Sequence, residues 1–211
     1  MRVLARMGFV TMLAASAMQA SSFSFQSSFS TDDQVQLFSV VLGSNSTVTF
    51  RTYGYAGGTD AAGMIISPGG FDPELTWYMA DGTEIGNNND GGCTHVATYL
   101  GACLDSYAQV FLTAGSYTVA LTESGNDPNG DLSTGVAEQG NPTFTATGAC
   151  NGPFCDFNGN QLNGKWEVDL LNVTSASGPG STVPEPASIL LTIGGLALFV
   201  RNRLRGGNSI K

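Results

Sequence analysis

The feature that most limits how this chain can fold is a two-residue alternation of apolar and polar side chains. The alternation recurs in seven short segments: SFSFQ, QVQLFSVVL, STVTFRTY, ELTWYMA, YAQVFL, SYTVALT and KWEVDLLNV. In ELTWYMA, Leu75, Trp77 and Met79 are expected to face one way and the residues between them the other. A period of two is that of a half-buried strand, and no segment of the body predicts a long helix.

Turn signals separate the apolar segments. They are ADGT at 80–83, TAGS at 113–116, SPGG at 67–70 and GNNNDGG at 86–92. Asp-Gly supplies the positive-φ residues of tight hairpins, and Asn and Asp satisfy local backbone donors. Many short strands joined in this way predict an all-β fold, an antiparallel β-sandwich of jelly-roll-like type over residues 21–174 with one wet face on its strands.

The N-terminal end has the pattern of a secretory signal peptide. Arg2 and Arg6 precede an apolar stretch from Met7 to Ala15, and small residues follow. This pattern predicts an N-terminal signal helix in residues 1–20, with cleavage between Ala17 and Ala20. An N-terminal membrane anchor is the alternative, which the apolar stretch disfavours because a span needs about 20 residues.

The C-terminal end predicts a second targeting segment at 184–211. Pro184, Glu185 and Pro186 precede an apolar helix at 187–200, which is shorter than the roughly 20 residues of an ordinary span. Prolines prevent the helix from starting earlier, and the basic tail after it favours the cytoplasmic side. That tail contains Arg201, Arg203 and Arg205. Residues 175–183, rich in Ser, Thr, Gly and Pro, are expected to form a flexible linker.

The charges of the chain separate its ends from its body. The net charge is −9, and six of the eight Lys and Arg residues lie in the two targeting ends. Only Arg51 and Lys165 remain in the body, against many acids between Asp32 and Asp169. The exported part is therefore expected to have a negative field that repels phosphate backbones, which excludes nucleic acid as a partner.

The chain contains four cysteines, for which disulfides are the default in an exported protein. We predict local pairing, Cys93 with Cys103 and Cys150 with Cys155, among the three possible connectivities. A zinc site is the alternative, but neither spacing is C-x-x-C and the chain has a single histidine.

The C-terminal segment resembles the PEP-CTERM sorting signal of Gram-negative bacteria, because Val183-Pro184-Glu185-Pro186, an apolar helix and a basic cluster follow in order. The resemblance implies that an exosortase-type membrane protease processes the tail. It also implies transit through the inner membrane and a final place at the cell surface or outside the cell, in bacteria that make extracellular polysaccharide.

A second resemblance covers Phe71 to Thr122. The Asp81-Gly82 turn, the Asn/Asp run at 87–90 and the hairpin AGSYTV at 114–119 are similar to those of bacterial pre-peptidase C-terminal domains. Those domains are small jelly-roll-like sandwiches attached to secreted proteins. The insertion that carries Cys93 and Cys103 departs from their simplest pattern.

No catalytic residue is predicted. His95 is the single histidine, and it lies in a short segment between two cysteines without a nucleophile motif such as G-x-S-x-G, so we expect a surface loop. Pairs of carboxylates for glycoside hydrolysis cannot be selected without geometry. No cofactor other than calcium is expected.

Calcium is the one metal that the loops suggest. In DPNGDLSTGVAE, the first, third, fifth and twelfth positions of an EF-hand-like loop are Asp127, Asn129, Asp131 and Glu138. Leu132 replaces the expected glycine, and no helices flank the segment, so a true EF-hand is disfavoured. The alternatives are a looser site of these residues, a site of Asp81, Asn87, Asn89 and Asp90, or ordinary turns.

Two further patterns have a functional and a structural interpretation. Thr143, Thr145 and Thr147 could present a row of hydroxyls to ice or sugar, or form a polar strand edge. Tyr53, Tyr55, Tyr78 and Tyr99 could stack on sugar rings or pack in the core.

Together these patterns predict a non-enzymatic, exported protein of the envelope or extracellular matrix, associated with exopolysaccharide or matrix proteins. A calcium-dependent carbohydrate-binding module or a secreted hydrolase on the same scaffold is the alternative.

Overall fold

The computed structural model describes residues 20–179 and 181–182. The predicted signal peptide, apart from Ala20, lies outside the described residues. So do the motif Pro184, Glu185 and Pro186, the helix predicted at 187–200 and the basic tail. Within the described part, no helix is long and apolar enough to span a bilayer.

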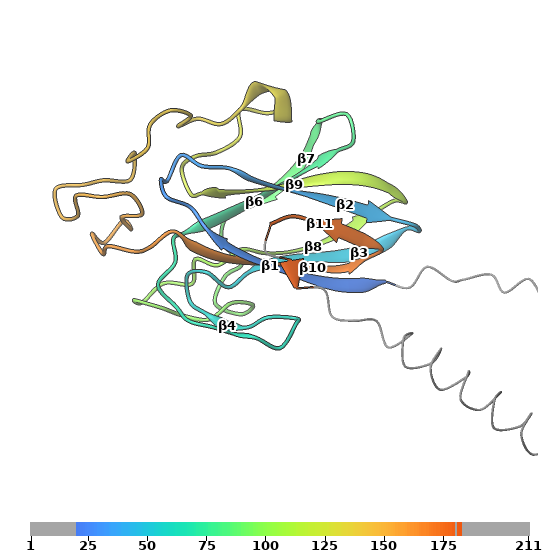
Figure 1. The fold of residues 1–211 in the computed structure, drawn as a ribbon, viewed down its shortest axis with the longest axis horizontal. Coiled ribbons are helices and arrows are strands. Elements are labelled where there is room, and N and C mark those ends of the chain that lie inside the picture. Colours follow the sequence, from blue (N-terminus) through green and yellow to red (C-terminus); the bar gives the residue numbers. More distant parts are fainter. Residues whose placement is uncertain (1–19, 180, 183–211) are drawn as a thin grey trace, which may run out of the picture.

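Two five-stranded sheets face each other (Figure 1), and every pairing between named strands is antiparallel. Sheet A contains, in spatial order, β12 (Ser181–Thr182), β1 (Ser21–Ser28), β10 (Lys165–Val173), β3 (Ser46–Thr52) and β8 (Tyr107–Leu112). Sheet B contains β11 (Ser175–Ser177), β2 (Gln36–Leu42), β9 (Gly115–Glu123), β6 (Pro73–Met79) and β7 (Glu84–Asn88). A small hairpin pairs β4 (Gly58–Thr59) with β5 (Ile65–Ile66), and one 3-10 turn, η1, covers Leu132–Thr134. The predicted all-β, antiparallel sandwich is confirmed.

The alternation of the sequence places aromatic side chains between the two sheets. Phe38 of sheet B is fully buried, and its ring centroid lies 5.1 Å from that of Phe25 and 5.7 Å from that of Trp166, both from sheet A. Phe50 and Trp77 make a similar contact at 5.5 Å. Tilted and edge-on aromatic pairs of this kind stabilise a core beyond the area they bury. All seven segments that alternate in the sequence contribute a strand.

Strand β6 corrects the expectation of one wet face. Leu75 and Trp77 face the core as expected, but Glu74, Thr76 and Tyr78 on the other face are also buried. The β9–β10 connection covers this face, since Tyr78 shares a groove with Leu132 and Val136 of that connection.

Strand β7 corrects a turn prediction. Gly86, Asn87 and Asn88, expected in a turn, pair with β6 instead, with Leu75 opposite Asn88. An Asn-rich segment has weak strand propensity, so the pairing with β6 decides its conformation.

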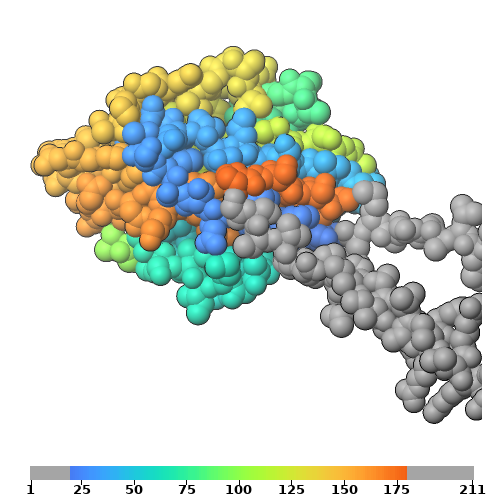
Figure 2. Space-filling model, viewed as in Figure 1, coloured from blue at the N-terminus to red at the C-terminus, as the bar shows by residue number. Residues whose placement is uncertain are grey.

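The connections between strands differ at the two ends of the sandwich. We call one the turn end, because short turns join its strands at 43–45, 80–83, 113–114 and residue 174. The other, the loop end, carries the four long connections: 29–35, 53–72, 89–106 and 124–164. In Figure 2 the last of these, coloured yellow to orange, forms much of one end of the molecule.

Both ends of the described chain lie at the turn end. Ser21 pairs with Val173 where β1 begins, and β12 returns along β1 with Thr182 opposite Ser24. Part of the expected linker is therefore not free of the sheets, because β11 pairs with β2 and β12 with β1. The composition of these Ser and Thr residues predicts a flexible linker. They form strands instead, because their backbone pairs with the open edge of a sheet.

Both disulfides lie in loop-end connections and pair as predicted. Cys93 bonds Cys103 with 5.2 Å between their Cα atoms, and Cys150 bonds Cys155 with 6.0 Å. Both separations fall in the usual range for disulfides.

Candidate functional site

Buried acids are the unusual feature of this domain. Within the described residues, eight acidic side chains are buried, so much of the negative charge expected on the surface lies inside. Acids are among the residues that proteins most rarely bury without a partner, so each of the eight needs a physical explanation. They are Asp32, Asp60, Glu74, Asp105, Glu123, Asp156, Glu167 and Asp169.

Five of these acids hold the loop end together, because their carboxylates accept hydrogen bonds from loop backbone N–H groups. They are Asp32, Asp60, Asp105, Asp156 and Asp169. A long connection buries N–H groups that no strand ladder satisfies, and a carboxylate can accept several of them at once. Their role is structural.

Asp105 shows this role most clearly. Its carboxylate accepts hydrogen bonds from Tyr55 N at 3.1 Å, from Ala56 N at 2.8 Å and from Thr52 Oγ1 at 2.9 Å. These bonds fasten the β7–β8 connection to the start of the β3–β6 connection.

Replacing Asp105 by alanine is expected to destabilise the chain by about 2–4 kcal/mol, because two buried backbone donors lose their acceptor at about 1–3 kcal/mol each. Urea unfolding followed by tryptophan fluorescence measures this loss. Asp131→Ala is the control, since Asp131 is exposed and accepts one long bond, from Glu84 N at 3.4 Å. Equal losses in the two variants would contradict the structural role of Asp105.

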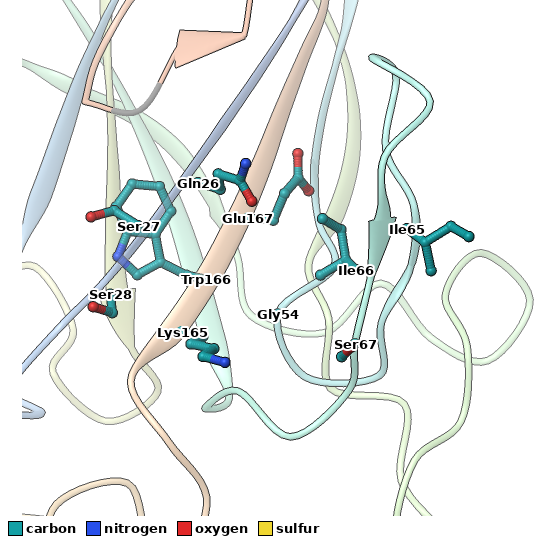
Figure 3. Close-up of a pocket in the computed structure, with 10 residues that line it drawn as sticks. All are labelled: Gln26, Ser27, Ser28, Gly54, Ile65, Ile66, Ser67, Lys165, Trp166 and Glu167. Atoms are coloured by element: carbon teal, nitrogen blue, oxygen red, sulfur yellow. The ribbon is translucent and has the colours of Figure 1, made fainter.

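A cleft of about 430 Å³ lies on the outer face of sheet A, between β1, β10 and the segment around β5 (Figure 3). The alternation that sends Trp166 and Val168 into the core sends Glu167 to this outer face. The β3–β6 connection closes the cleft from outside, and Ala61 N donates to Asp169 at 2.9 Å to hold it there. The polar residues on its walls are Gln26, Ser27, Ser28, Ser67, Lys165 and Glu167.

Glu167 differs from the five structural acids. It is 1% exposed, and its carboxyl oxygens have no hydrogen-bond partner other than the adjacent Asp169 carboxyl. Burial is the main cause that raises the pKa of Glu167 to about 11, and the adjacent Asp169 carboxyl raises it further. Glu167 is therefore a neutral carboxylic acid at pH 7, able both to donate and to accept a hydrogen bond.

Arg51, on the strand next to β10, does not pair with Glu167 but lies over two tyrosine rings. Arg51 of β3 lies with its guanidinium carbon 4.3 Å from the ring centroid of Tyr53 and 5.9 Å from that of Tyr107. Cation–π contacts of this kind hold the guanidinium over the rings. Lys165 is the basic residue that lines the cleft.

The structure does not gather the EF-hand-like residues around one point. Within residues 20–179 and 181–182, no three His, Cys, Asp or Glu side chains come together as metal ligands. The segment folds into a narrow hairpin instead, with Ala137 N donating to Asp127 O and Asn129 N to Gly135 O.

The four predicted ligands have separate partners, three through their side chains and Asn129 through its backbone. Asp131 accepts from Glu84 N, and Glu138 accepts from Asn141 Nδ2 at 2.8 Å. Asp127 contacts Glu74, whose pKa burial raises to about 8. Asn129 serves through its backbone carbonyl, which accepts from Thr134 Oγ1 at 3.0 Å.

The second candidate set also makes separate contacts. Asp81 accepts from Thr83 N at 3.0 Å, as expected for a turn, and Asn87 donates to Glu84 at 3.4 Å. Asn89 donates to Ser124 Oγ at 2.9 Å, and burial raises the pKa of Asp90.

The remaining predicted residues have structural contacts. His95 is exposed in a loop, where its ring stacks on Tyr107 at 4.6 Å. Tyr53, Tyr55 and Tyr78 are buried, and Tyr99 packs against Tyr55 at 5.6 Å. Tyr55 and Tyr99 therefore pack with the core, whereas Tyr53 lies under Arg51 and Tyr78 lies on the covered outer face of β6.

The threonine row is not formed. Thr143 and Thr145 lie in a turn, Thr145 Oγ1 donates to Asp32 at 2.6 Å, and Thr147 Oγ1 contacts Cys155 Sγ. The alternation therefore does not present three hydroxyls on one face, and neither the ice-binding nor the strand-edge interpretation holds.

Glu167 was not among the residues that the sequence patterns singled out. In KWEVDLLNV it occupies a polar position of an alternating strand, and such positions normally face water. The one sequence feature that could have pointed to Glu167 is that it is an acid within a strand, a residue type that strands disfavour.

Comparison with known proteins returned neither a matching family model nor a matching curated protein.

Proposed function

We propose that this chain is a non-enzymatic, exported protein of the cell envelope or extracellular matrix. Its sandwich is of jelly-roll-like type, and its PEP-CTERM-like tail holds it in the inner membrane until an exosortase-type protease processes it. It then reaches the cell surface or the extracellular space, where exopolysaccharide or matrix proteins are its partners.

One observation carries the proposal: both ends of the described chain lie at the turn end, and the long connections lie at the other. The tail continues from β12, which pairs with the beginning of β1. A membrane-held tail would therefore place the turn end toward the membrane and direct the loop end away from it (Figure 1).

The two disulfides support export. Both pairs close local loops, and bonds of this kind persist in oxidising compartments. Their position in the connections of the loop end suits a face that is exposed outside the cell.

The strand order supports the jelly-roll-like assignment. Sheet A contains the order β1-β10-β3-β8 and sheet B the order β2-β9-β6-β7, so among these eight strands the chain changes sheet at every step except from β6 to β7, as in a double-sheet jelly roll. The pre-peptidase C-terminal domains that residues 71–122 resemble are of this type.

Replacing Pro184, Glu185 and Pro186 together by alanine is expected to leave export intact and to trap an uncleaved chain in the inner membrane. The reason is that the protease would lose its recognition motif while the apolar segment stays in place. Fractionation and intact-mass measurement in a host that makes an exosortase detect the trapped form.

Pro179→Ala is the matched control, since it removes a proline before the motif and should leave processing unchanged. Normal processing of the triple variant would contradict the sorting proposal.

A further inference from the structure

We propose that the cleft on sheet A binds an acidic sugar, a single ring that carries hydroxyl groups and one carboxylate. Glu167 and Gln26 contact its hydroxyls, and Lys165 contacts its carboxylate. The site lies within the described domain. Binding at this site is a function additional to sorting and does not depend on it.

The cleft has the size of a small-molecule site. Its volume of about 430 Å³ falls within the roughly 300–1,000 Å³ of ligand pockets. Figure 3 shows Gln26 and Glu167 near one another, with Lys165 and Ser67 farther along the cleft and Ile66 on the β5 side. A ligand in the cleft would therefore touch polar groups from three strand segments.

Glu167 is the observation that points to a ligand. Five other buried acids satisfy loop N–H groups, but Glu167 lines the cleft and has at least one buried oxygen without a hydrogen-bond partner, since Asp169 is the one side chain that can engage it. A buried polar group without a partner is unfavourable, and a bound hydroxyl group would satisfy it. The adjacent Asp169 carboxyl can engage at most one of these oxygens, and it already accepts hydrogen bonds from Ser24 and Ala61.

The polar groups of the cleft match a polyhydroxyl ligand. A neutral Glu167, the amide of Gln26 and the hydroxyls of Ser28 and Ser67 can each donate and accept hydrogen bonds. A sugar hydroxyl does the same, whereas an anion such as sulfate only accepts. Ile66 offers an apolar wall to the C–H face of the ring.

Lys165, the one cation among the described residues that line the cleft, can pair with the carboxylate of an acidic ring. Lys165 is exposed and is one of only two basic residues between 21 and 174. The indole of Trp166 packs against Phe29 and Phe38 in the core, so it provides no stacking surface in the cleft. Hydrogen bonds and one charge would therefore select the ligand.

Binding of D-glucuronate and of D-glucose to the full chain in detergent tests the proposal by isothermal titration calorimetry. Glucuronate is expected to bind with a Kd at or below about 1 mM and at least about tenfold more tightly than glucose. Glu167→Leu is expected to weaken glucuronate binding about tenfold or more, and Lys165→Met to abolish the preference for glucuronate over glucose.

Matched variants separate binding from folding. Glu74→Leu removes another buried acid, on sheet B and away from the cleft, and should leave binding unchanged. Glu167→Leu should fold at least as stably as the parent chain, because it replaces an unsatisfied buried acid with an apolar side chain of similar size. Thermal unfolding of each variant checks this.

Several results would overturn the proposal. They are the absence of heat with either sugar up to roughly 10 mM, unchanged affinity in Glu167→Leu, and equal loss in Glu74→Leu. A wild-type chain that binds both sugars equally would refute the role of Lys165. Failure here would leave the sorting experiment unaffected, because that experiment reads processing of the tail.

Discussion

Replacing Phe38 by alanine is expected to destabilise the sandwich by about 3–5 kcal/mol, the usual cost of removing a buried aromatic side chain. Phe38 is fully buried and contacts Phe25 and Trp166 of the opposite sheet. Its removal would leave a cavity between the sheets that neighbouring side chains fill only in part. Urea unfolding of the full chain, followed by tryptophan fluorescence, measures the loss.

Leu37 provides the matched control on the same strand. It is 43% exposed on the outer face of β2, so Leu37→Ala is expected to cost about 1 kcal/mol or less. The contrast between adjacent residues tests the register of β2 directly. Equal losses, or a larger loss at Leu37, would contradict the described inward and outward faces.

The second large effect is a fall in stability as pH rises from about 5 to 8. Burial raises the pKa of Asp72 and of Glu74 to about 8 and that of Glu167 to about 11. The folded chain therefore keeps protons that the unfolded chain releases near pH 4, and each such proton lowers the free energy of unfolding by about 1.4 kcal/mol per pH unit.

The sign follows from the direction of these pKa values. A carboxyl with a raised folded-state pKa destabilises the fold above its unfolded pKa, and the loss grows until the folded pKa is reached. For Asp72 and Glu74 this window ends near pH 8, and for Glu167 it extends to about 11. We expect a fall of at least about 1.4 kcal/mol per pH unit, the effect of one such group.

Urea unfolding midpoints at pH 5, 6, 7 and 8 measure this dependence. Glu167→Gln should make it shallower, because the variant lacks one titrating group. Stability that stays constant or rises over this range would show that the buried carboxyls are ionised in the folded chain.

The strands and the disulfide pairs could be predicted from the sequence, because they depend on residues that are close together along the chain. The strand around Trp77 and that around Trp166 follow from alternation alone. Cys150 and Cys155 are five positions apart and Cys93 and Cys103 ten, so their pairing is also a local property.

The candidate site could not be predicted in this way. Glu167 has the pattern of a solvent-facing residue, and the segment that covers it is distant in the sequence and has no period of its own. The separation of the EF-hand-like residues has a related reason. The spacing of Asp127 and Glu138 fits a loop around an ion, but backbone pairing between 127 and 137 closes the segment into a hairpin.

The order of residues along the chain was enough to locate the strands, to say which side of each meets the core and to pair the cysteines. Those properties depend on side-chain period and on short loops. Only the tertiary structure shows which polar faces of the strands are covered. Long connections that are distant in the sequence cover Glu74 and Glu167. Burial, and with it the protonation and the chemistry of an acid, depends on contacts that no local pattern encodes.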